Sequence, residues 1–172
     1  MQSRPAVAEV LRVVARQHTR LRGLLHEVAL SSESGRTRTT GWLSDYLLLH
    51  VAAEQVALCR ESAIERESPA ARWPLVELAQ GLDPTEPGIH RRLDTLEAAL
   101  LRHARAQERS VLPRMLRSWP LDDLHYAAVV LEAADIVFDR GPAEPAVTGL
   151  SAVDSWHSAV GDILRVATLA VP

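Results

Sequence analysis

The stretch "YLLLHVAAEQVAL", residues 46–58, decides the fold that this sequence predicts. Most of its side chains are apolar, yet it carries His50 and Glu54, four residues apart. Residues at this spacing in an α-helix lie on one face, about 40° apart around the axis. A polar group buried without a partner costs several kcal/mol, so this pair needs neighbouring polar groups or a bound ion.

Two further segments place polar residues on an otherwise apolar helical face. Between residues 7 and 28, apolar residues recur in alternating steps of four and three, and His18 occupies one of these positions. The same spacing over residues 89–107 includes His103 and, one turn later, Gln107. Because such stripes face the core of a helical bundle, we expect His18, His50 and His103 to meet in one buried layer.

Breaker residues divide the rest of the chain into helical segments, and no segment alternates with the period of two that a strand would show. Helices are predicted at about 5–30, 42–66, 70–81, 88–117, 121–138 and 149–170, with loops or breaks at 31–41, 83–88, 118–120 and 139–149. We therefore predict an all-α fold. Residues 1–117 form an up-down four-helix bundle, and residues 118–172 add two helices that either pack on it or form an interface with a second chain.

The composition narrows the classes of function. The net charge is -3, which offers no basic field for nucleic acid. All 19 basic residues are arginine, so neither a Schiff-base lysine nor a phosphate-loop lysine is available. No apolar run approaches the roughly 18 residues of a membrane span, and the N-terminus lacks a secretory signal, so we expect a cytoplasmic protein without a membrane partner. The bias toward arginine and alanine indicates a GC-rich bacterial genome.

Histidine and carboxylate side chains on facing helices are typical ligands of iron, manganese or zinc in bundle cores. The alternative is a hydrogen-bonded polar layer without metal. His26, His90, His125 and His157 lie beside the predicted stripes or on the C-terminal helices, and we expect ordinary surface or partly buried roles for them. The single cysteine, Cys59, cannot form an internal disulfide, and we interpret it as a buried, inert thiol.

Three segments together resemble the hemerythrin-like family, whose members carry an HHE cation-binding domain. They are "HTRLRGLLHEV" (18–28), "HVAAEQVAL" (50–58) and "HARAQERSVLP" (103–113), within a region of roughly residues 10–117. The resemblance implies a four-helix bundle around a non-heme di-iron centre that binds oxygen or senses or handles small molecules such as peroxide and nitric oxide. It also implies metal ligands at His18, His50, Glu54 and His103.

The sequence departs from the family pattern at two places. Gln107 stands where the family has a second glutamate, and the segment "ERESPAARWPLVEL" (65–78) lacks the further histidine that the family carries early in its third helix. Glu108 follows Gln107, but on an ideal helix it points about 140° away from His103, so we expect a supporting or pocket role for both residues. We therefore predict a depleted site with at most one metal per chain, iron or another divalent ion.

A metal-free bundle stays open as the second hypothesis. In that reading the chain is a partner subunit, or it binds or converts a small organic ligand in the former metal pocket. No serine or cysteine has the surroundings of a hydrolase nucleophile, and no glycine-rich phosphate loop is present. The residues by themselves therefore do not decide whether the protein is an enzyme.

Overall fold

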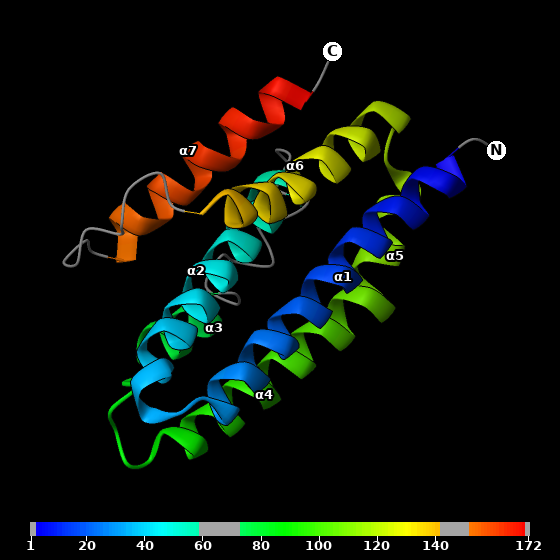
Figure 1. The fold of residues 1–172 in the computed structure, drawn as a ribbon. Helices are drawn as coiled ribbons and strands as arrows, with labels where there is room; N and C mark the ends of the chain where they lie inside the picture. The colour runs from blue at the N-terminus through cyan, green and yellow to red at the C-terminus, as the bar shows by residue number, and fades with distance from the viewer. Residues whose placement is uncertain (1–2, 59–72, 142–151, 171–172) are drawn as a thin grey trace.

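The structure, a computed structural model, describes residues 3–58, 73–141 and 152–170 (Figure 1). Within these ranges every regular element is helical and no strand occurs, which confirms the all-α prediction for this part of the chain. The helices are α1 (Ser3–Leu30), α2 (Glu33–Leu58), α3 (Trp73–Gln80), α4 (Ile89–Ala106), α5 (Leu112–Met115), α6 (Leu121–Arg140) and α7 (Ala152–Ala170). None of these described helices combines the length and the apolar character that a membrane crossing requires.

Helices α1 to α4 contact one another in chain order, and α4 returns to lie beside α1. The colour order in Figure 1 shows that α1 runs antiparallel to both α2 and α4. Helix α6 packs against both α1 and α2, and α7 packs against α6 and α2. The buried face of α6 consists of Leu124, Ala127, Ala128, Val130, Leu131, Ala133 and Ala134. Its small residues allow α6 to lie close to the first two helices.

The predicted loop at 31–41 is wrong, because α2 already begins at Glu33. The carbonyl of Ser32 accepts hydrogen bonds from the backbone N–H groups of Gly35 and Arg36, which starts the helix. Thr39 and Thr40 are buried, so the first turns of α2 belong to the packed interior. Glycine and threonine cost a helix about 1 kcal/mol or less each, and tertiary packing overrides such propensities.

The helix predicted at 88–117 contains a wide turn that the sequence reading did not include. Helix α4 ends at Ala106, a π-turn named η2 covers Gln107–Val111, and α5 and a 3₁₀ turn, η3 (Leu116–Ser118), follow. Pro113 has no backbone N–H, so the carbonyl of Arg109 cannot receive the usual α-helical hydrogen bond. The N–H of Leu112 instead bonds the carbonyl of Gln107, five residues earlier. Such insertions are frequent at functional sites.

The remaining boundaries agree with the predicted ones to within a few residues, where the structure describes them. Turns occupy 83–88, and a short break at Trp119 and Pro120 precedes α6. Helix α6 ends at Arg140, and Gly141 follows with a φ of 71°, a positive value that glycine adopts without strain. The predicted helix ends at 66, 70 and 149 and the role of Cys59 lie outside the described residues.

Candidate metal centre

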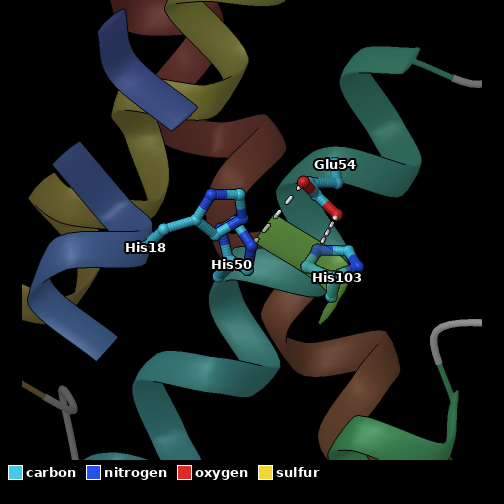
Figure 2. A group of neighbouring side chains, drawn as sticks. All are labelled: His18, His50, Glu54 and His103. Atoms are coloured by element: carbon cyan, nitrogen blue, oxygen red, sulfur yellow. Dashed lines mark ion pairs between the residues drawn. The ribbon is translucent and has the colours of Figure 1, made fainter. Parts of the chain in front are cut away.

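Three helices bring the predicted ligands together (Figure 2). His18 comes from α1, His50 and Glu54 from α2, and His103 from α4, and one donor atom of each lies within 4.8 Å of the other three. The first three are buried with exposed fractions of 2% or less. The three imidazole rings meet edge to face with centroids 4.9 to 5.9 Å apart. The predicted convergence of the three histidines is therefore confirmed.

Glu54 lies between two of the imidazoles. Its Oε1 is 3.6 Å from Nε2 of His50, and its Oε2 is 3.3 Å from Nε2 of His103. Four donors around one ion at bonds of about 2.1 Å would lie about 3.4 Å apart in a tetrahedron. The two Glu54 distances are close to that spacing but involve different carboxylate oxygens, and donor separations of up to 4.8 Å require a small inward movement before one ion can contact all four residues. The geometry fits a single small cation.

The imidazole of His18 is oriented by a residue of the π-turn. Nδ1 of His18 lies 2.7 Å from Oε1 of Glu108, whose side chain is 38% exposed. A carboxylate accepts here, so Nδ1–H donates and Nε2 faces the interior as a lone-pair donor for a metal. Nε2 of His18 is buried and has no hydrogen-bond partner among the described residues. Glu108 thus supports His18 from outside the ligand group.

Gln107 occupies the layer beside Glu54. It is buried, and its Nε2 donates to Oε2 of Glu54 at 3.2 Å. Its Oε1 is also buried and has no hydrogen-bond partner in the described part of the chain. An amide nitrogen that donates to a carboxylate cannot bind a cation through the same atom. Gln107 therefore contacts the carboxylate of Glu54, as His50 and His103 do, and adds no anionic donor to the group.

The sequence reading missed Gln17. This residue is fully buried on α1, its Oε1 lies 2.9 Å from Nδ1 of His50, and its Nε2 donates to the carbonyl of Leu131 on α6 at 2.6 Å. A signal was available, because Gln17 lies three residues after Val14 and four before Leu21, on the same apolar stripe. Two adjacent polar residues, Gln17 and His18, therefore face the interior.

Burial lowers the pKa of His18 below its ordinary value of 6.5, while the charges of Glu54 and Glu108 oppose part of this effect. The lowered pKa keeps the ring neutral at neutral pH, which is the form that binds metals. His26, His90, His125 and His157 are exposed and take no part in the cluster. The surface role expected for His26 and His90 is confirmed, whereas the partly buried position expected for His125 and His157 is wrong, because both side chains are exposed.

A second polar group lies one helical turn before His50. The hydroxyl of Tyr46 donates to Asp135 on α6, and Arg16 bonds the same carboxylate at 2.8 Å. The guanidinium of Arg20 lies 4.8 Å from the Tyr46 ring centroid. Burial, together with the hydrogen bond to Asp135, raises the pKa of Tyr46 far above its ordinary value of 10. This group joins α1, α2 and α6 beside the candidate metal layer.

Comparison with known protein families, with curated proteins and with solved structures finds no match to this chain.

Proposed function

We propose that this chain is a hemerythrin-like, non-heme metal-binding protein that holds one divalent metal, iron in the first instance. The ligands in this proposal are His18, His50, Glu54 and His103. One observation carries it: three imidazoles and one carboxylate from three helices lie within 4.8 Å of one another in the interior. Buried histidine clusters of this kind are costly unless something binds them, and this donor set suits iron, manganese or zinc.

The charges of the site support one metal and oppose two. Three neutral imidazoles and the single carboxylate of Glu54 offset one of the two charges of a divalent ion. A second dication would add two more charges with only the neutral amide of Gln107 beside it, and unbalanced charge in a core is expensive. Glu108 is held against His18 and is not in the donor group.

A bound metal would supply Lewis acidity and an open coordination position for oxygen, peroxide or another small ligand. The protein's own contribution is to hold the donors. Helix α2 presents His50 and Glu54 from one face, and Glu108 orients His18. The fully buried Leu21, Leu47 and Leu100 each lie three residues from a site histidine on the same helix, so apolar side chains flank the layer and limit the access of water. Exclusion of water strengthens every charge interaction in the site.

A metal-free polar layer is the second candidate, and one observation favours it. Glu54 accepts a hydrogen bond from Gln107 and lies within 3.6 Å of nitrogen atoms of both His50 and His103. These groups therefore satisfy one another in part without a cation. The three ring centroids lie only 4.9 to 5.9 Å apart, and this close packing disfavours the version of this candidate in which an organic ligand binds between the rings.

Metal analysis decides between the two candidates. We expect the protein purified without chelator to carry at most one metal per chain by elemental analysis. Titration of the stripped protein with Co²⁺ should give one binding event with a visible absorption band. His18→Ala and His103→Ala should each weaken binding by at least about 100-fold, because each removes a quarter of the donor set.

Two exposed histidines on the same helices provide matched controls. His26→Ala on α1 and His90→Ala on α4 should leave the affinity within about 2-fold, since neither side chain is part of the cluster. A folded wild-type protein that binds no Co²⁺, Zn²⁺ or Fe²⁺ would refute the metal proposal and leave the metal-free layer. Equal losses in the site variants and the controls would show that the metal binds elsewhere.

A further inference from the structure

A hydrogen-bonded chain connects helix α6 to His50 through one residue of α1. The carbonyl of Leu131 on α6 accepts from Nε2 of Gln17, and Oε1 of Gln17 lies 2.9 Å from Nδ1 of His50. Gln17 and His50 are both fully buried. Both ends of the Gln17 amide are engaged, one by Leu131 and the other by His50, so the amide contacts the site through His50.

The chemistry of the chain fixes where each proton lies. A backbone carbonyl can only accept, so the amide NH₂ of Gln17 must face Leu131. The amide oxygen then faces His50, and an amide oxygen can only accept, so Nδ1 of His50 must carry the hydrogen. The Nε2 atom of His50 lies 3.6 Å from Glu54, longer than the 2.9 Å contact that Nδ1 makes. The neutral ring is therefore the Nδ1–H tautomer, with its lone pair on Nε2.

We propose that Gln17, itself anchored by the α6 carbonyl of Leu131, is a positioning residue that selects the Nδ1–H tautomer of His50 and aims Nε2 at the metal. The metal part of this proposal rests on the proposed function, whereas the tautomer part does not. It also gives α6 a role in the site. A shift of α6 along α1 would break the bond to Leu131, free the amide to rotate and release the constraint on His50.

The two oriented histidines of the site differ in what orients them. His18 has a carboxylate, Glu108, that is partly exposed, whereas His50 has a neutral amide that is completely buried. A buried carboxylate at position 17 would have to be paired or protonated. A neutral amide orients the imidazole of His50 without burying a charge. Its NH₂ group needs a hydrogen-bond acceptor, which the carbonyl of Leu131 supplies.

Nitrogen-15 NMR of the stripped protein at mildly alkaline pH tests the proton placement, with His50→Gln used to assign the signals. In the wild type, the His50 signals should show a protonated Nδ1 and an unprotonated Nε2. Gln17→Leu should move the ring toward the Nε2–H tautomer. Gln17→Glu should keep the Nδ1–H tautomer, because a glutamic acid that donates its proton to the Leu131 carbonyl still accepts from Nδ1 through its other oxygen. A wild-type Nε2–H tautomer, or the same tautomer population in Gln17→Leu, would overturn the proposal.

Metal affinity provides the second readout. Gln17→Leu should weaken Co²⁺ binding by about 10- to 100-fold, the usual effect of losing a group that orients a ligand, and should change the cobalt absorption band. The control is Arg16→Gln, which removes a neighbouring contact between α1 and α6 at Asp135 without touching His50. It should change the affinity by less than about 3-fold, and an equal loss in both variants would overturn the positioning role.

The two readouts separate this inference from the proposed function. If the tautomers behave as expected and the wild type binds no metal, the proposed function fails and the proton placement stands. If the wild type binds one metal and Gln17→Leu changes neither tautomer nor affinity, the proposed function stands and the role of Gln17 fails. If Gln17→Leu does not fold, the wild-type tautomer and Gln17→Glu still decide.

Discussion

Replacement of Gln107 by glutamate tests the charge balance of the buried layer. In the wild type the amide of Gln107 donates to Oε2 of Glu54 at 3.2 Å, and both side chains are buried. Gln107→Glu replaces the donor with an acceptor of nearly the same shape. Without metal, the variant therefore brings two carboxylates together inside the core.

The cost of this change can be worked out from the distance. Two negative charges 3.2 Å apart repel by about 5 kcal/mol at an effective dielectric constant of about 20. Taking up a proton is cheaper, because keeping a glutamic acid of ordinary pKa about 4.3 protonated at pH 7 costs about 4 kcal/mol. The metal-free variant should therefore be about 4 kcal/mol less stable than the wild type at pH 7.

The sign of the pH dependence follows from linkage. The pair raises the pKa of the new carboxyl in the folded state, so the folded chain binds more protons than the unfolded chain. The penalty is then absent below about pH 4 and grows as the pH rises toward the raised pKa. We expect the difference in unfolding free energy between Gln107→Glu and the wild type to shrink to about 1 kcal/mol at pH 5.

A divalent metal should reverse the effect, since two carboxylates balance its two charges. Chemical denaturation with chelator and with Co²⁺, together with elemental analysis, measures both sides of this prediction. The metal-dependent gain in stability should be larger in Gln107→Glu than in the wild type, by about 1.4 kcal/mol for each tenfold gain in affinity. Metal occupancy should rise accordingly.

The matched control is Gln80→Glu, the same chemical change at an exposed position of α3. It should alter stability by less than about 0.5 kcal/mol, with or without metal. Equal stability of Gln107→Glu and wild type at pH 7 with chelator would refute the assigned contact with Glu54. Two metals in the wild type would refute the charge argument, and destabilisation without any gain in metal would favour the metal-free layer.

Four further predictions concern the fold and its pH dependence. Leu96→Ala should lower the free energy of unfolding, measured by chemical denaturation, by about 2–5 kcal/mol, because Leu96 is buried and its truncation leaves a cavity. A loss below about 1 kcal/mol would contradict its core position. Tyr46→Phe should cost about 1.5–3 kcal/mol, since it removes a buried hydrogen bond to the Asp135 carboxylate, and an unchanged unfolding midpoint would contradict that bond. Because the pKa of His18 is lowered in the folded state, the unfolded chain protonates this histidine at a higher pH than the folded chain does. The unfolding free energy of the stripped protein should therefore fall by up to about 1.4 kcal/mol per pH unit below pH 6.5. His18→Gln should flatten that slope, and an unchanged slope would contradict the lowered pKa. Truncation after Trp119 should lower the melting temperature or cause aggregation, because α6 covers α1 and α2; a soluble, equally stable monomer would refute this.

The sequence by itself determined the all-α class and the layer in which the candidate ligands meet. Both follow from local regularities. A spacing of three and four places His18, His50 and His103 on the buried stripes of their own helices, whatever the neighbours are. Because buried polar groups require partners, helices with one such histidine each are expected to align them. The structure brings these three rings together.

Tertiary structure decided the supporting contacts. Pro113 predicts an interrupted helix, but whether the helix kinks, ends or widens into a π-turn depends on what packs around it. Here the π-turn forms, and it carries Glu108, which contacts His18. Likewise, Gln17 and Leu131 are 114 residues apart, and their bond depends on the register of α6 against α1. No local pattern encodes that register, because it is set by the packing of two whole helical faces.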